Sequence, residues 1–231
     1  KIPIVVGFPL RGEWYAPNTP GSKIPSHGTN RLGSRYAYDF IQVDWIEKGI
    51  PLIRQVFWNI FCGAFHWPDI ILGQEVYAPC NGVVVEARDG YPERPRTNLL
   101  GDLENAYQNA RHFDPDKDDV QAVAGNFVII QCAEGVYAAL VHLHTGSQVA
   151  AGQSVTKGER IGRVGHSGNS FAPHLHFQLM DRCDLASARG LPCAFERYEV
   201  FRDGNWLTVR DGVPTKRDRI RFLSSNSPGD R

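Results

Sequence analysis

The sequence predicts an all-β fold with an antiparallel sheet. Two β-favouring runs, Asn126 to Ala133 and Val136 to Leu143, are separated only by Glu134-Gly135, a connection typical of a two-residue β-hairpin. Glycines then divide residues 145–170 into pieces that are too short for helices. Together these features favour a tightly turned sheet in the second half of the chain.

Further strands are expected on both sides of this hairpin. Glu75 to Ala87 is rich in valine around Asn81-Gly82, which predicts two short strands hinged at a turn. His174 to Met180 predicts another strand. Near the C-terminus, Arg197 to Val209 predicts a second hairpin, with Asp203-Gly204 as its turn.

Two segments depart from this strand pattern. Pro51 to Gly63 carries apolar residues at helical spacing, which predicts a short amphipathic helix with Phe57 and Phe61 mostly buried. Asp89 to Gly125 is rich in Pro, Asn, Asp and Arg and is interpreted as an irregular surface loop. We therefore expect one domain over residues 1–210, with insertions at about 45–74 and 89–125 and a solvated C-terminal tail over 211–231.

The composition gives no indication of a nucleic-acid partner or of a membrane-spanning segment. The 231 residues include 25 Lys+Arg and 25 Asp+Glu, so the balanced charge gives no general reason to expect a nucleic-acid partner. The longest apolar region, Val56 to Leu72, is interrupted by polar residues and proline, and no transmembrane segment is predicted. The first residues show no signal-peptide pattern, which leaves the cytosol and a processed extracytoplasmic form both open. The oligomeric state also stays open.

The five cysteines show none of the close paired spacing of a cysteine-rich zinc site, and an odd number cannot all pair within one chain. Cys183 and Cys193 bracket a short loop, where a disulfide and two free thiols are equally compatible with the sequence.

Three histidine-containing segments are candidates for chemistry. In Pro173 to Leu179, the alternation of a strand places His174, His176 and Gln178 on one face. The same alternation places His142 and His144 on one face of their strand, and His144 is interpreted as exposed. The third segment holds His27 and, after an irregular link, Asp39 within an aromatic run. Each pattern alone is also compatible with ordinary polar decoration. His66, His112 and His166 are expected to have surface or core roles.

Taken together and in this order, these segments resemble the lysostaphin-type (LytM-like) metallopeptidases, and the resemblance extends from about Phe8 to Met180. It implies an antiparallel, barrel-sandwich-like peptidase core. It also implies one zinc ion per chain held by His27, Asp39 and His176, with His142 and His174 as the catalytic residues. The interval from His27 to Asp39 is longer than in the best-known members and is similar to a variant of the family.

The resemblance implies zinc-dependent hydrolysis of an amide bond in the peptide part of bacterial peptidoglycan, and a location in the cell envelope or outside the cell. Two alternatives belong to other classes. One is a binding or regulatory domain of the same fold that has no catalytic activity. The other is a biotinyl or lipoyl carrier domain, because Val149 to Gly158 is similar to such domains around Lys157.

Overall fold

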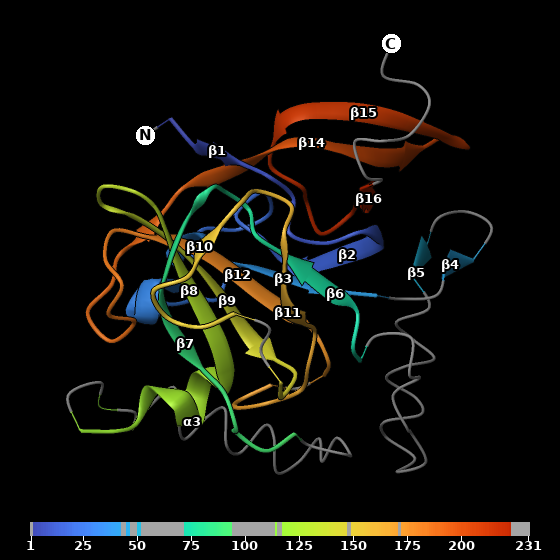
Figure 1. The fold of residues 1–231 in the computed structure, drawn as a ribbon. Helices are drawn as coiled ribbons and strands as arrows, with labels where there is room; N and C mark the ends of the chain where they lie inside the picture. Colours follow the sequence, from blue (N-terminus) through green and yellow to red (C-terminus); the bar gives the residue numbers. More distant parts are fainter. Residues whose placement is uncertain are drawn as a thin grey trace.

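The structure is a computed structural model that describes residues 2–42, 45–46, 50–51, 72–93, 114, 117–146, 149–170 and 172–222. The chain is dominated by β-strands (Figure 1). The strands of the first half are β1 (Ile4–Val6), β2 (Gly12–Asn18), β3 (Tyr38–Ile41), β4 (Trp45–Ile46), β5 (Ile50–Pro51), β6 (Glu75–Tyr77) and β7 (Gly82–Arg88). Those of the second half are β8 (Asn126–Ala133), β9 (Val136–Leu143), β10 (Ser154–Val155), β11 (Arg160–Arg163), β12 (Leu175–Met180), β13 (Gly190–Leu191), β14 (Cys193–Arg202), β15 (Asn205–Gly212) and β16 (Arg219–Phe222).

One large sheet organises the molecule. Its strand order is β1-β14-β16-β2-β3-β12-β9-β8-β7-β10, with β13 beside β12 and β15 beside β14. Its pairs are antiparallel except for β1 with β14. A second, two-stranded sheet is formed by β11 and β6. The predicted all-β class with an antiparallel core is confirmed.

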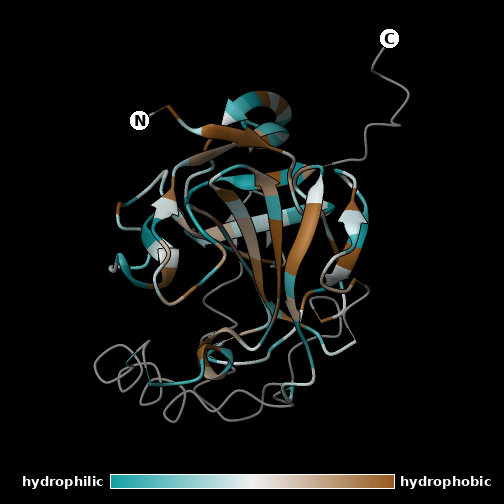
Figure 2. Cartoon of the chain, turned by 60° about the vertical axis from the view of Figure 1, so that its left-hand side comes forward, coloured by the Kyte–Doolittle hydropathy of each residue, from teal (hydrophilic) through white to brown (hydrophobic). Residues whose placement is uncertain are grey.

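The core lies along the central strands. Hydrophobic residues run along these strands, whereas the connecting loops are largely hydrophilic (Figure 2). Burying a large apolar side chain contributes roughly 1.5–3 kcal/mol, so the fully buried aromatic residues contribute much of the driving force. These residues are Trp14, Tyr38, Phe40, Phe127, Phe177 and Phe195. The strands that hold the candidate histidines are therefore rigidly packed.

Both predicted hairpins are present. The first has the predicted bounds, with β8 and β9 joined at Glu134-Gly135. The second, β14 with β15, is longer than predicted and turns at Asp203-Gly204, where both residues have positive φ. The valine-rich segment forms two strands as expected, but β6 pairs with β11 in the small sheet and β7 pairs with β8 in the large one.

The C-terminal segment corrects one expectation. The sequence predicted a solvated tail from residue 211, whereas Arg219–Phe222 form β16, between β14 and β2 in the large sheet. The side chain of Ile220 is fully buried there. A strand of four residues, in which two arginines alternate with Ile220 and Phe222, is too short to give a clear local pattern. The β2 strand that it pairs with lies far away in sequence.

The two insertions are described only in part. The predicted helix over Pro51 to Gly63, with Phe57 and Phe61, lies outside the described residues apart from Pro51. In the second insertion, Asp119 caps a short helix, α3 (Val120–Ala124), which lies beside the ends of β7 and β8 (Figure 1). The interpretation of Asp89 to Gly125 as wholly irregular surface was therefore wrong for this part, since Ala124 is buried.

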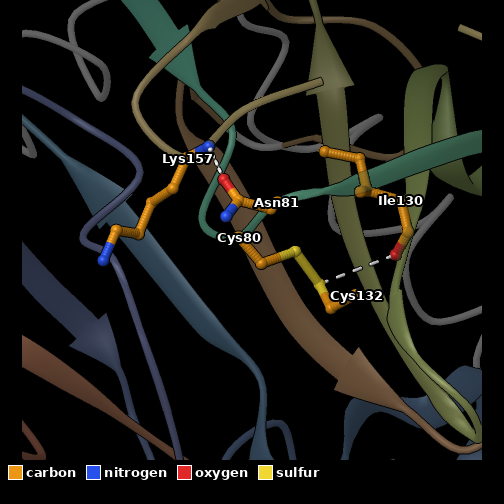
Figure 3. Close-up of a disulfide and its surroundings, with 5 residues drawn as sticks. All are labelled: Cys80, Asn81, Ile130, Cys132 and Lys157. Carbon is orange, nitrogen blue, oxygen red and sulfur yellow. Dashed lines mark hydrogen bonds between the residues drawn. A yellow bond between two sulfur atoms is a disulfide. The ribbon is translucent and has the colours of Figure 1, made fainter. Parts of the chain in front are cut away.

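A disulfide joins Cys80, in the turn between β6 and β7, to Cys132 on β8 (Figure 3). The sequence did not indicate this pair, because the two cysteines are 52 positions apart. Cys183 and Cys193 are not bridged. Cys183 is exposed, and burial raises the pKa of the Cys193 thiol to about 12, so Cys193 is a neutral core residue.

Lys157 lies beside this disulfide (Figure 3). Its backbone amide donates to Asn81 Oδ1, and its Nζ atom forms an ion pair with Glu196 at 2.8 Å. None of the helices in the described part of the chain is long and apolar enough to span a membrane.

Candidate metal centre and active site

The strands β3, β12 and β9 lie side by side at the middle of the large sheet and carry most of the candidate residues. Antiparallel pairing sets Asp39 on β3 directly opposite His176 on β12. On the other side of β3, Asn18 is opposite Asp39. His27 lies outside the strands, in the link between β2 and β3. The register of three strands therefore brings together residues that are far apart in sequence.

His27, Asp39 and His176 form a compact group. The Nε2 atom of His27 lies 2.8 Å from Asp39 Oδ2, and the Nδ1 atom of His176 lies 2.9 Å from Asp39 Oδ1. Each of the three residues offers one ligand atom, and these atoms lie within 4.8 Å of one another. Asn18 Nδ2 donates a further hydrogen bond to Asp39 Oδ2 at 2.7 Å.

The outer ring nitrogen of His27 is held by a serine. Ser26 Oγ lies 3.0 Å from His27 Nδ1 and 3.2 Å from the carbonyl oxygen of Ser34. The other ring nitrogen of His27, Nε2, faces Asp39. A metal ion at this position would bind the lone pair of the neutral ring at Nε2.

A similar contact holds His176. Gln178 Nε2 donates to the carbonyl oxygen of Leu32 at 2.7 Å, which sets the orientation of the side-chain amide. Gln178 Oε1 then accepts from His176 Nε2 at 3.0 Å, and His176 Nδ1 faces Asp39. Two ring nitrogens and a carboxylate thus converge, each histidine having its other nitrogen held by an outer partner, as in metal sites of proteins.

Gly33 makes the contact of Gln178 with the preceding loop possible. A Cβ atom at Gly33 would lie 2.6 Å from Gln178 Nε2, and its φ of +73° belongs to the left-handed region that favours glycine. The segment Arg31–Tyr36, a 3-10 helix interrupted at Leu32 and Gly33, therefore supports His176 through Gln178.

His142 comes from the neighbouring strand at a β-bulge. The β8–β9 register shifts between the pairs Asn126–Leu143 and Phe127–Val141, which leaves His142 as the extra residue, with a φ of +61°. Such bulges redirect a side chain and are common next to active sites. Because His142 Nδ1 lies 2.9 Å from the carbonyl oxygen of Ser167, which can only accept, Nδ1 carries the hydrogen and Nε2 the lone pair.

His174 has the same protonation. Its Nδ1 atom lies 2.7 Å from the carbonyl oxygen of Ala172, and its Nε2 atom lies 3.5 Å from Asp39 Oδ1. The ring centroids of His142 and His174 are 4.7 Å apart, and those of His142 and His176 are 6.0 Å apart. Two imidazoles with available Nε2 atoms thus lie beside the group formed by His27, Asp39 and His176.

The surroundings of these residues shift their pKa values in different directions. Burial opposes the charge on Asp39, but the His27 ring and then the His174 and His176 rings outweigh burial and hold the pKa of Asp39 well below its ordinary value. Burial, followed by the charges of His174 and His176, lowers the pKa of His142 well below its ordinary value. Burial would also lower the pKa of His174, but the Asp39 carboxylate outweighs it and raises that pKa. Opposite shifts on adjacent groups are typical of acid–base sites.

The structure therefore brings together all five residues predicted from the sequence: His27, Asp39, His142, His174 and His176. His142, His174 and His176 form a second group with metal-ligand spacing that shares His176 with the first. His144 is half-buried rather than exposed and bonds the carbonyl oxygen of Thr145. His166 is buried, and His66 and His112 lie outside the described residues.

Sequence reasoning missed the residues that hold the histidines. Ser26 and Ser170 gave no signal, because an isolated serine in a loop has many ordinary roles. Gln178 was predicted on the face of His176, but its bond to that ring was not. Asn18 could be found only once the pairing of β2 with β3 was known.

Comparison with known proteins identifies a related peptidase family. Residues 115–187 match the profile of Peptidase family M23. This segment of the chain is similar to that peptidase family. The M23 segment contains His142, His174 and His176, whereas His27 and Asp39 precede it. The resemblance to lysostaphin-type peptidases is confirmed.

A curated relative is the peptidoglycan DD-endopeptidase ShyA of Vibrio cholerae, with 41% identity over 59 residues. This match covers 26% of the chain and 14% of ShyA, so it concerns only a small part of that protein.

Solved structures with a similar arrangement include the catalytic domain of the antimicrobial peptidase lysostaphin from Staphylococcus simulans. That domain has a TM-score of 0.39 and 19% identity, with coverage of 78% of this chain and 88% of the other. The M23 metalloprotease pseudoalterin from the deep sea has a TM-score of 0.42 and 14% identity, with coverage of 89% and 95%. Both TM-scores are below 0.5, so the similarity in shape is limited.

Proposed function

We propose that this chain is a zinc-dependent endopeptidase that hydrolyses an amide bond in the peptide part of bacterial peptidoglycan. The observation that carries the proposal is the convergence of three candidate ligand atoms, from His27, Asp39 and His176, beside the Nε2 atoms of His142 and His174. The M23 segment and the relationship to a peptidoglycan endopeptidase support the class of substrate.

The donor set suits zinc. His27 Nε2, an Asp39 oxygen and His176 Nδ1 are the nitrogen and oxygen ligands that zinc prefers, and three protein ligands are typical of catalytic rather than structural zinc sites. When bound, zinc would supply Lewis-acid polarisation of the scissile carbonyl and of a water molecule. His27, Asp39 and His176 would hold the ion through their inward-facing atoms.

His142 and His174 would act on protons. Each keeps its Nδ1 hydrogen on a backbone carbonyl, so its Nε2 atom is the one that takes a proton from the attacking water or returns it to the leaving amine. A protonated Nε2 would also donate to the negative oxygen of the tetrahedral intermediate. Which histidine performs which step is a matter for kinetics.

The disulfide supports an envelope or extracellular location. Structural disulfides persist in oxidising compartments such as the bacterial periplasm and the extracellular space, and they are rare in the cytosol. The Cys80–Cys132 bridge therefore agrees with a peptidoglycan substrate, which lies outside the cytoplasm.

The test separates metal binding from catalysis. We expect His176→Ala to lose zinc, since only two of the three proposed ligands remain. His142→Ala and His174→Ala should keep zinc while turnover falls by roughly 10²–10⁴-fold. Zinc is measured by elemental analysis, and turnover by mass spectrometry of digests of peptidoglycans with different cross-links.

The double variant gives a further check. If His142 and His174 act as one unit, the double variant should be little worse than the poorer single variant. Unchanged zinc content in His176→Ala would overturn the ligand assignment. A zinc-loaded wild-type chain that binds peptidoglycan but cleaves none of the substrates would instead indicate a binding domain.

A further inference from the structure

A buried hydroxyl lies behind the proposed acid–base residue His174. Ser170 Oγ is 3.1 Å from His174 Nδ1 and 3.0 Å from His166 Nδ1, and it donates to the carbonyl oxygen of Ala172 at 2.7 Å. Ser170 and His166 are each 1% exposed. Two imidazoles and one backbone carbonyl are therefore linked through a single side chain that the proposed chemistry does not use.

The hydrogens of this network can be assigned. Ser170 has one hydrogen, which the Ala172 carbonyl accepts, so its oxygen accepts from the neighbouring rings. His166 Nδ1 donates to Ser170 Oγ. The His174 Nδ1 hydrogen lies between two acceptors, the Ala172 carbonyl oxygen and Ser170 Oγ. Ser170 thus holds both the ring and the carbonyl that the ring contacts.

We propose that Ser170 is a positioning residue that fixes the orientation of the His174 ring, with His166 supporting Ser170 from behind. The proposal rests on the proposed function, in which His174 exchanges protons through Nε2. Without the hydroxyl, the Ala172 carbonyl loses a donor and the His174 ring loses one of two contacts that keep Nε2 directed toward Asp39. Both effects reduce the fraction of His174 in the reactive arrangement.

The main variant is Ser170→Ala in the zinc-loaded chain. We expect kcat to fall by roughly 10–100-fold, the usual cost of losing an outer hydrogen-bond partner, with KM and zinc content unchanged. Nitrogen NMR of the histidine rings should show a shifted Nδ1 signal for His174, because one of the two acceptors of its hydrogen is gone. Ser170→Thr keeps the hydroxyl and should restore both the kcat and the Nδ1 signal.

Thr19→Val is the matched control. Thr19 is also buried, and its hydroxyl also donates to a backbone carbonyl, that of Pro214, but it contacts none of the five site residues in the described hydrogen bonds. It should lower stability without changing kcat or the His174 signal, so a general loss of stability is separated from a loss of positioning.

The outcomes are distinct from failure of the proposed function. A wild-type chain that binds zinc but cleaves no peptidoglycan rejects the function, and the Nδ1 signal of His174 still tests the role of Ser170. An unchanged His174 signal in Ser170→Ala overturns the positioning role whether or not the chain is active. An equal loss of kcat in Thr19→Val also overturns it.

Discussion

At the scale of single residues, every histidine of the site is held through the nitrogen that faces away from it. His27 Nδ1 lies against Ser26 Oγ, His176 Nε2 donates to Gln178, and His142 and His174 donate to backbone carbonyls of the segment between β11 and β12. These outer bonds decide which nitrogen is available, because a neutral imidazole carries only one ring hydrogen. The hydrogen bonds of the outer nitrogens therefore decide which nitrogen of each histidine faces the site.

Gln178 provides a residue-scale prediction. Gln178→Ala removes the acceptor at His176 Nε2, so the ring is free to turn and its Nδ1 lone pair is no longer fixed toward Asp39. We expect zinc affinity to fall by roughly 10–100-fold, measured by competition with a chromophoric chelator.

Gln131→Ala is the control for this variant. Gln131 lies on β8 opposite Tyr137, near the turn of the hairpin, whereas His142 lies near the other end of β9. Equal affinities in the two variants would contradict a role of Gln178 in holding His176.

At the scale of elements, the start of the second insertion joins two loops at the edge of the site. Glu93 accepts from the backbone amide of Thr145 at 3.1 Å and from that of His166 at 2.8 Å. Thr145 follows β9, which carries His142, and His166 precedes Ser170 and His174. Asp89 similarly accepts from the amide of Gly146. Asp89 and Glu93 therefore support the loops that adjoin both proposed catalytic histidines.

Glu93→Ala should accordingly affect catalysis more than metal binding. The variant leaves two backbone amides without their carboxylate acceptor. Each amide that stays buried without a new partner lowers the free energy of unfolding by about 1–3 kcal/mol. We expect a lower kcat and a lower midpoint of unfolding with zinc content unchanged, since the proposed ligands lie on other segments.

Glu196→Ala is the comparison, because it removes only a surface ion pair with Lys157 and such pairs contribute about 0–1 kcal/mol. Loss of zinc in Glu93→Ala would show that the loops also shape the metal group.

At the scale of the whole molecule, the Cys80–Cys132 disulfide ties the turn before β7 to the end of β8. A cross-link between residues 52 positions apart restricts the unfolded chain and should stabilise the fold by about 4 kcal/mol. Replacing both cysteines by serine should therefore lower Tm by roughly 8–16 °C, measured by calorimetry.

Cys183→Ser is the matched variant, since Cys183 is exposed and unbridged, and its Tm should equal that of the wild type. A double serine variant that is as stable as the wild type under oxidising conditions would show that the bridge contributes nothing to the fold.

The sequence by itself determined the elements that rest on local chemistry. The Glu134-Gly135 and Asp203-Gly204 turns, the valine-rich strands and the alternation of His174, His176 and Gln178 follow from turn preferences and from the two-residue period of a strand. The resemblance added His27 and Asp39, which have no local pattern of their own.

Only the tertiary structure decided how these parts meet. The pairing of Asp39 with His176, the bulge that redirects His142, the partners of each ring nitrogen, the Cys80–Cys132 bridge and the place of β16 all depend on contacts between distant segments. Local propensity carries no information about such contacts, because the free energy that selects one register comes from burial and hydrogen bonding across the assembled sheet. The residues of the site could be read from the chain, but the partner of each ring nitrogen is set by the fold.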